Sequence, residues 1–184
     1  MPIRLITGDG PGKTTSSLGI ALRMLGHGHN VVMIQWMKNW ENTGEYKIQE
    51  VFGERYKVYQ FGQSSWLKLS EEKTEYDGKV YGAKEIERKD RVAAYEGLKK
   101  AEEVIGWAKK PNLLILDEIC LAAGMGLLEV DEVVDLMNKI PKEMYTIMTG
   151  RNAPQKILDN ADYVIIEKLK KAPENYEARE GIEF

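Results

Sequence analysis

The sequence predicts a three-layer α/β fold with a mainly parallel central sheet of about six strands and helices on both faces. Short apolar or β-branched runs alternate with helical patterns, which is typical of parallel sheets because each parallel strand needs a crossover connection. The runs at 31–34 and 113–116 lack polar alternation, as expected for central strands covered on both faces. The predicted strands are Pro2–Thr7, Asn30–Trp36, Arg55–Phe61, Asn112–Asp117, Met144–Thr149 and Tyr163–Glu167.

The remaining segments are assigned by their periodicity. Apolar residues recur at three- and four-residue steps between Val92 and Ile105, which predicts one long helix over 83–109 with a charged outer face, stopped by Pro111. Segment 62–82 has no clear period and is expected to be an irregular loop on the substrate side. With 184 residues, 43% of them hydrophobic, we expect one domain over 1–184, with a polar C-terminal tail at 169–184.

A glycine-rich loop, Thr-Gly-Asp-Gly-Pro-Gly-Lys-Thr-Thr at 7–15, lies between the first predicted strand and a helical run. Such a loop binds phosphate because its backbone N–H groups and the helix N-terminus face the anion. Lys13 adds a positive charge, and the hydroxyl of Thr14 is suited to Mg²⁺. Thr7 replaces the usual first glycine, and two glycines lie inside the loop instead. The sequence therefore predicts nucleotide binding on a P-loop NTPase-like (RecA-like) fold.

Charged residues end two other predicted strands. Asp117 and Glu118 follow an apolar run, and next to a phosphate loop we expect them to hold Mg²⁺ directly or through water. Without the loop, capping of the next turn would be an equally good interpretation. Arg151 is expected at the same rim, either as a phosphate clamp or as an ordinary surface arginine, and Arg23 carries the same ambiguity. All strand ends should open onto one crevice at the carboxyl edge of the sheet.

Composition and missing motifs exclude several classes of function. The net charge of −3 comes from nearly balanced acids and bases, so no nucleic-acid partner is expected. A single cysteine, Cys120, and the absence of a long uninterrupted apolar run predict a cytoplasmic protein without membrane contact. No Ser-His-acid arrangement or Cys/His cluster is evident, and His27 and His29 read as turn residues. Covalent catalysis by the protein is therefore disfavoured.

Four tryptophans are distributed unevenly along the chain. Trp36 ends a predicted strand, Trp40 follows it, and Trp66 lies in the irregular segment, whereas Trp107 falls late in the long helix and is expected in the core. The first three either line an apolar binding surface at the crevice or pack in the core, which is the more frequent role of any single tryptophan.

Several motifs in order resemble the ATP:corrinoid (cob(I)alamin or cob(I)yrinic acid a,c-diamide) adenosyltransferases of the phosphate-loop type, over essentially the whole chain. The resemblance implies transfer of the 5′-deoxyadenosyl group of ATP to Co(I) of a reduced corrinoid, giving adenosylcobalamin or a precursor and releasing triphosphate. Because Co(I) is itself a strong nucleophile, no catalytic base is needed. The matching segments are the loop at 7–15, Arg-Met-Leu-Gly-His-Gly at 23–28, Gln-Trp-Met-Lys at 35–38, Leu-Asp-Glu-Ile at 116–119, Gly-Leu-Leu-Glu at 126–129, Thr-Gly-Arg at 149–151 with Pro154 and Ala161-Asp162, and Gly-Ile-Glu-Phe at 181–184.

The resemblance also implies roles for individual residues, a homodimer and a flavoprotein reductant. Lys13 and Glu118 would be catalytic, and Thr14, Asp117 and Glu118 would bind Mg²⁺. Trp66 matches the corrinoid side, and we expect Phe61 and Trp36 there too. By resemblance the nucleotide-binding residues would be Gly10, Gly12, Lys13, Thr14, Thr15 and Arg23. From their places in the loop and at the rim we also expect Gly8, Asp9 and Arg151 to contact the nucleotide.

The chain departs from the family pattern at three positions. Asp9 and Pro11 replace a neutral asparagine and a basic residue often found in the loop, which adds a negative charge and removes an N–H. Ser64 replaces an aromatic residue for which Phe61 is the candidate substitute. Two other functions stay open at this point: an ATPase or small-molecule kinase in which Glu118 orients the nucleophile, and a nucleotide-gated protein that delivers corrinoid without forming the bond.

Overall fold

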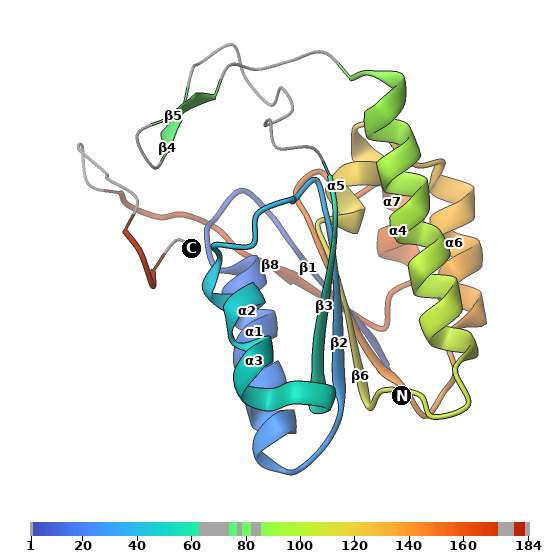
Figure 1. Cartoon of the computed structure of the whole chain (residues 1–184). Helices are drawn as coiled ribbons and strands as arrows, with labels where there is room; N and C mark the ends of the chain where they lie inside the picture. Colours follow the sequence, from blue (N-terminus) through green and yellow to red (C-terminus); the bar gives the residue numbers. More distant parts are fainter. Residues whose placement is uncertain (1, 63–73, 77–78, 82–85, 173–178, 183–184) are drawn as a thin grey trace.

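The six strands predicted from the sequence form one parallel sheet with the order β3-β2-β6-β7-β1-β8 (Figure 1). The computed structural model describes residues 2–62, 74–76, 79–81, 86–172 and 179–182. Each predicted strand is confirmed to within one residue at either end. The strands are β1 (Ile3–Thr7), β2 (Val31–Trp36), β3 (Tyr56–Phe61), β6 (Leu113–Asp117), β7 (Tyr145–Thr149) and β8 (Tyr163–Ile166).

Helices cover both faces of the sheet, as predicted (Figure 1). One face carries α1 (Lys13–Gly26), the short helices α2 (Gly44–Lys47) and α3 (Gln49–Phe52), and a 3-10 turn at Gly53–Arg55. The other face carries α4 (Arg88–Gly106), α5 (Ile119–Gly124), α6 (Val130–Lys139) and α7 (Gln155–Asp159). Each layer encloses an apolar cluster, so the central strands β2 and β6 are buried along their whole length.

The edge strand β8 behaves differently from the other five. All four of its side chains are exposed, although the run Tyr-Val-Ile-Ile is as apolar as the buried strands. It pairs with β1 on one side only, because it lies at the end of the sheet. The residue directly after β8 is Glu167, and its N–H donates to the carbonyl of Thr7 at 2.7 Å. This strand therefore ends directly beside the glycine-rich loop.

The long helix α4 is shorter than the predicted 83–109. It begins at Arg88 because Glu87 and Asp90 form a capping box, in which the Asp90 carboxylate accepts the N–H of Glu87 at 2.8 Å. It ends at Gly106, since Trp107 adopts an extended backbone. Trp107, expected in the core, is half-buried at its rim. The predicted start at 83 lies outside the described residues.

Segment 62–82 contains regular structure that the sequence did not indicate. An antiparallel pair, β4 (Thr74–Tyr76) and β5 (Lys79–Tyr81), lies within it, so the expectation of an irregular loop is wrong at these residues. Strands of three residues are too short to give a visible period. Ser64 and Trp66 lie outside the described residues. In the described ranges, no helix has both the length and the apolar character needed to span a membrane.

Candidate nucleotide site at the carboxyl edge of the sheet

The glycine-rich loop connects β1 to the N-terminus of α1. Gly12, with φ of +107°, is the N-cap of α1, and no side chain caps the helix there. The first N–H groups of a helix have no intrahelical acceptor, and the helix dipole makes this end positive. The loop can therefore bind an anion through main-chain N–H groups at 13–15, among which Thr15 is exposed.

Lys13 lies across the loop rather than in solvent. Its side chain is 5% exposed, and its Nζ donates to the carbonyls of Gly8 at 2.8 Å and Gly10 at 2.5 Å. Burial, and then the positive charge of Arg151, lower the pKa of Lys13 below its ordinary value. The ammonium is thus held at the phosphate loop with a second cation close by, which is the arrangement that a polyanionic ligand requires.

Gly8 and Gly10 have a role that the sequence did not indicate. A Cβ on Gly8 would lie 2.3 Å from the carbonyl oxygen of Glu167, and one on Gly10 would lie 2.9 Å from its carbonyl carbon. The N–H of Gly10 donates to this same oxygen at 3.0 Å. The N–H of Gly10 is thus used within the protein, and its predicted contact with phosphate stays a prediction. Both glycines allow the end of β8 to pack against the loop.

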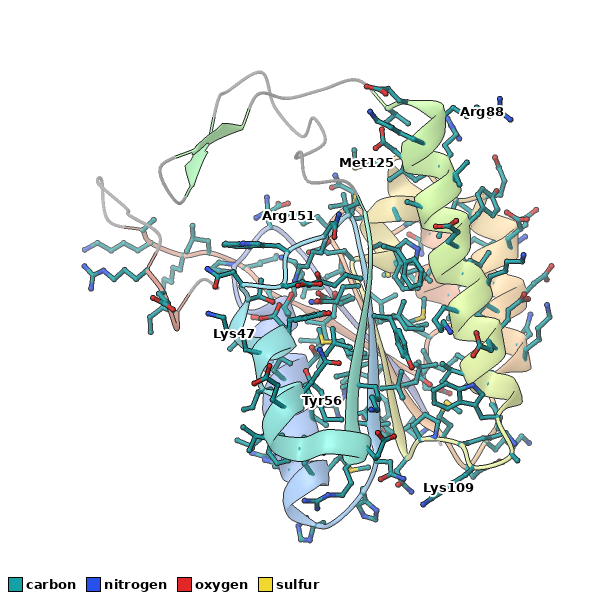
Figure 2. The ribbon with its side chains drawn as sticks, in the orientation of Figure 1. Lys47, Tyr56, Arg88, Lys109, Met125 and Arg151 are labelled. Atoms are coloured by element: carbon teal, nitrogen blue, oxygen red, sulfur yellow. The ribbon has the colours of Figure 1, made fainter. Side chains whose placement is uncertain are left out.

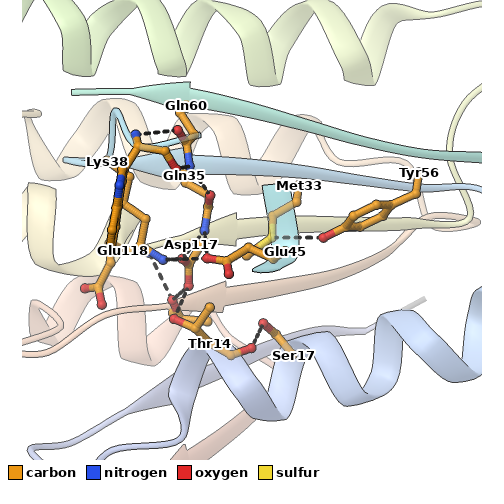
Figure 3. A network of polar contacts seen from close by, with 12 residues as sticks. Thr14, Ser17, Met33, Gln35, Lys38, Glu45, Tyr56, Gln60, Asp117 and Glu118 are labelled. Atoms are coloured by element: carbon orange, nitrogen blue, oxygen red, sulfur yellow. Dashed lines mark hydrogen bonds and ion pairs between the residues drawn. The ribbon is translucent and has the colours of Figure 1, made fainter. Parts of the chain in front are cut away.

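Asp117 is a fully buried acceptor at the end of β6 (Figure 3). Its Oδ1 accepts the hydroxyls of Thr14 at 2.9 Å and Thr149 at 2.7 Å. Its Oδ2 accepts Gln35 Nε2 at 3.0 Å and Lys38 Nζ at 2.9 Å. Burial opposes its ionisation, but the charge of Lys38 and these hydrogen bonds outweigh burial and hold the pKa of Asp117 below its ordinary value.

Glu118 differs sharply from its neighbour. Its backbone is left-handed, with φ of +66°, and its N–H donates to Thr149 Oγ1 at 2.9 Å. Its Oε2 is buried and has no hydrogen-bond partner among the described residues. Burial, and then the negative charge of Asp117, raise the pKa of Glu118 to about 7. A buried carboxylate oxygen without a donor is costly, so this atom marks the place where an external cation or donor would bind.

These residues fit Mg²⁺. The Thr14 hydroxyl donates its hydrogen to Asp117, which leaves its oxygen lone pairs free, and Glu118 Oε2 supplies a second oxygen. Mg²⁺ usually takes only one or two protein oxygens and completes its shell with phosphate and water. A closed protein cage is not present, because the described residues contain no cluster of three or more His, Cys, Asp or Glu suited to a metal. Asp117 already accepts four hydrogen bonds, which leaves no free lone-pair position on its carboxylate in this structure, so its direct binding of Mg²⁺ stays a prediction.

The two arginines predicted to contact phosphate lie in different parts of the structure. Arg151 follows β7 at the carboxyl edge, where its charge acts on both Lys13 and Glu118 (Figure 2). Arg23 is exposed in the last turn of α1. Ten residues at about 1.5 Å each place it about 15 Å along the helix from Lys13. Arg23 therefore lies away from the glycine-rich loop in this structure, and its contact with a phosphate stays a prediction.

The aromatic residues considered for the crevice differ in their burial and contacts. Trp36 is fully buried, and its Nε1 donates to the carbonyl of Ala94 in α4 at 2.9 Å, so its prediction as a corrinoid contact is wrong. Phe61 is half-buried at the carboxyl end of β3. Trp40 is half-buried in the connection after β2, where the side-chain amide of Gln60 bonds both its N–H at 2.7 Å and its carbonyl at 3.2 Å.

Other predicted features lie as expected or away from the site. Asp9 is exposed in the loop, and its charge acts on Lys13. Cys120 is fully buried, and burial raises the pKa of its thiol, which removes it as a nucleophile. His27 and His29 lie at the turn after α1, at the opposite end of this helix from the phosphate loop.

The sequence did not identify Gln35, Lys38 and Glu45 as parts of the site, whereas Thr149 was expected at the crevice but without a role of its own. Gln35 and Lys38 fall within a segment noted only as a family motif, and their polar types at the end of a buried strand are the signal that pointed to them. Glu45, on α2, contacts Lys38 at 3.3 Å and accepts Gln35 Nε2 at 3.1 Å. No local pattern distinguishes Glu45 from the other acidic residues of the chain.

The fold and the site together define a nucleotide-binding α/β protein with a phosphate loop at the carboxyl edge of a parallel sheet. The family model described as ATP:corrinoid adenosyltransferase BtuR/CobO/CobP matches residues 2–184, and the chain belongs to this family. It is 29% identical over 182 residues to a corrinoid adenosyltransferase of Sinorhizobium sp, covering 97% of this chain and 78% of that protein. It is also 29% identical to the corrinoid adenosyltransferases of Escherichia coli K12, over 162 residues, and Salmonella typhimurium LT2, over 164 residues, in each case covering 88% of this chain and 74% of the relative.

Proposed function

We propose that this protein transfers the 5′-deoxyadenosyl group of ATP to Co(I) of a reduced corrinoid and releases triphosphate. Family membership supports the reaction, and one observation carries it to this site. Lys13 is buried across a loop that caps a helix N-terminus, next to a buried carboxylate oxygen that lacks a partner. This arrangement binds a polyanion and a cation, and the buried thiol of Cys120 offers no competing nucleophile.

For this reaction the protein has to align the two substrates and stabilise the charge of the leaving group. The Co(I) lone pair of the substrate attacks C5′ of the ribose, the C5′–O bond breaks, and its electron pair leaves with triphosphate. No proton has to be transferred. The negative charge on the leaving oxygen is greater in the transition state than in bound ATP. This charge is stabilised by Lys13, Arg151 and the N–H groups at the start of α1.

Mg²⁺ would be held by Thr14 and Glu118, with Asp117 orienting Thr14. When bound, it neutralises part of the charge of the phosphate oxygens. Phe61 and Trp66 remain the proposed corrinoid contacts. The ATPase or kinase alternative is not favoured, because the family transfers adenosyl groups and not phosphoryl groups.

We further propose a homodimer in the cytoplasm that receives its electrons from a flavoprotein. The exposed apolar edge strand β8 supports a contact between protein chains, since such edges are usually covered. Analytical ultracentrifugation over a range of micromolar concentrations measures the molar mass in solution and so tests the dimer. A molar mass of one chain at every concentration would contradict it.

The experiment that tests the reaction mixes the protein with ATP, Mg²⁺ and chemically reduced cobalamin without oxygen. The proposal expects the absorbance spectrum of adenosylcobalamin together with triphosphate as the phosphate product. ADP with an unchanged corrinoid spectrum would overturn it and favour a kinase or ATPase. Tight ATP-dependent corrinoid binding without turnover would also overturn it and favour a delivery protein.

A further inference from the structure

Lys38 forms a partly buried ion cluster with Asp117 at the end of β6 and Glu45 on α2 (Figure 3). Its Nζ lies 2.9 Å from Asp117 Oδ2 and 3.3 Å from Glu45 Oε1. The exposed fractions of the three side chains are 26% for Lys38, 0% for Asp117 and 9% for Glu45. Charges this deep are held in place by specific partners, so the cluster fixes the connection after β2 against the end of β6.

The hydrogen bonds of Asp117 show what Lys38 does there. An ionised carboxylate has about four lone-pair positions, and four protein donors fill those of Asp117. Of these donors, only Lys38 carries a charge. Because Lys38 and Gln35 occupy Oδ2, Oδ1 is left to the two hydroxyls of Thr14 and Thr149. The direction of the Thr14 hydroxyl is therefore set through Asp117.

A second set of bonds holds Lys38 itself in position. Gln35 Nε2 donates to both Asp117 and Glu45, and Gln60 Nε2 on β3 donates to Gln35 Oε1 at 3.0 Å. The ammonium of Lys38 therefore contacts one acid on β6 and one on α2, and Gln35 of β2, itself held by Gln60 of β3, ties these two acids together. A lysine on the surface is solvated by water and needs no such set of buried polar partners. The buried network around Lys38 therefore argues for a function at the adjoining nucleotide site.

We propose that Lys38 is a positioning residue of the nucleotide site, the built-in counterion of Asp117. It keeps Asp117 Oδ1 directed at Thr14 and keeps Oδ2 closed to an external cation. The oxygen of Thr14 and Glu118 Oε2 are then the groups left to receive Mg²⁺ with the nucleotide. The inference rests on the proposed ATP site but not on the corrinoid reaction.

The test compares Lys38→Met with Lys38→Arg, which keeps the charge, and with Lys57→Met as a matched control. Lys57 lies on β3 and forms an exposed ion pair with Glu54 at 2.8 Å, away from the nucleotide site. Titration calorimetry with MgATP alone should show a Kd raised about tenfold or more in Lys38→Met, the effect of losing roughly one charge-assisted hydrogen bond. Lys38→Arg should recover most of the affinity, and Lys57→Met should bind as the wild type does.

Asp117→Asn separates action through Asp117 from direct contact with ATP. Adding Lys38→Met to Asp117→Asn removes both charges, which a protein tolerates better than the loss of one, so this comparison is available even where Lys38→Met alone fails to fold. The proposal expects Asp117→Asn and the double variant to have the same Kd for MgATP to within about twofold. A tenfold further loss in the double variant would overturn it, because Lys38 would then act on the nucleotide directly.

Two outcomes keep this inference distinct from the proposed function. A folded Lys38→Met protein that binds MgATP as tightly as the wild type overturns the inference, even where the wild type makes adenosylcobalamin. A wild type that makes no adenosylcobalamin, with the expected loss of MgATP affinity in Lys38→Met, supports the inference and overturns the proposed reaction.

Discussion

Gly8 and Gly12 allow the packing of the glycine-rich loop to be tested with a matched pair of substitutions. Both have a left-handed φ, +102° at Gly8 and +107° at Gly12. A Cβ on Gly8 would lie 2.3 Å from the carbonyl oxygen of Glu167, whereas one on Gly12 would meet no atom within 4 Å. Gly8→Ala and Gly12→Ala therefore share the backbone strain and differ in the steric clash.

The magnitudes follow from these contacts. A residue with a side chain at such a φ costs about 1–3 kcal/mol, and this applies to both variants. In Gly8→Ala the end of β8 must also move, since the Cβ would lie far inside the contact distance of about 3.5 Å. That shift strains two backbone hydrogen bonds of Glu167, with Thr7 and with Gly10, each worth about 1 kcal/mol. We expect Gly8→Ala to lose about 2 kcal/mol more stability than Gly12→Ala.

Urea unfolding followed by circular dichroism measures the difference, provided that the denaturant slopes agree. Gly19→Ala provides a control of opposite sign: Gly19 is an exposed helical residue of α1 with open space at its Cβ, so the substitution should stabilise the protein by about 0.5–1 kcal/mol. Losses for Gly8→Ala and Gly12→Ala that agree within about 0.5 kcal/mol would refute the reasoning, because β8 would then not constrain the loop.

Three further substitutions test the site. Lys13→Ala should lower turnover by orders of magnitude at an unchanged fold, measured by adenosylcobalamin formation and circular dichroism, and retained turnover would contradict its role. The folded-state pKa of Glu118, about 7 against 4.5, means that the folded protein binds the proton more tightly, so stability falls as pH rises from 4.5 through 7. Glu118→Gln should remove this fall and be about 3 kcal/mol more stable at pH 8, and urea curves that keep the wild-type pH slope would count against it. Trp36→Phe loses the bond to Ala94 and should cost about 1–2 kcal/mol while the KM for corrinoid stays unchanged; a raised KM would return Trp36 to the substrate side.

The strands were predictable because their apolar runs are short, frequent and rich in β-branched residues. The order of the strands in the sheet was not predictable, and β8 shows why. The sequence of β8 is as apolar as that of β6, yet β8 lies at the edge with its side chains exposed. Local sequence reports that a segment forms a strand, whereas its neighbours in the sheet depend on the path of the whole chain.

The same limit divides the site. The loop residues and Asp117 are recognisable because strand, glycines and charge follow one another in the sequence. The pairing of Gln35 with Asp117 arises only because β2 lies beside β6 in that register. Once Gln35 faces the nucleotide side, the alternation of strand residues sends Trp36 to the opposite face, into the core under α4. Register therefore explains both the missed glutamine and the wrong tryptophan.

Asp117 and Glu118 are adjacent acids with different chemistry, and Thr149 accounts for the difference. Its hydroxyl donates to Asp117 Oδ1 and accepts the N–H of Glu118, so one side chain bridges both residues while the backbone turns left-handed between them. Asp117 is thereby saturated by protein donors, and Glu118 keeps a buried oxygen without a partner in the described part of the chain. A cation that enters the site gains little at Asp117 and most at Glu118, where its charge would also lower the raised pKa. The metal position that we propose therefore depends as much on the carboxylate that is already occupied as on the one that is free.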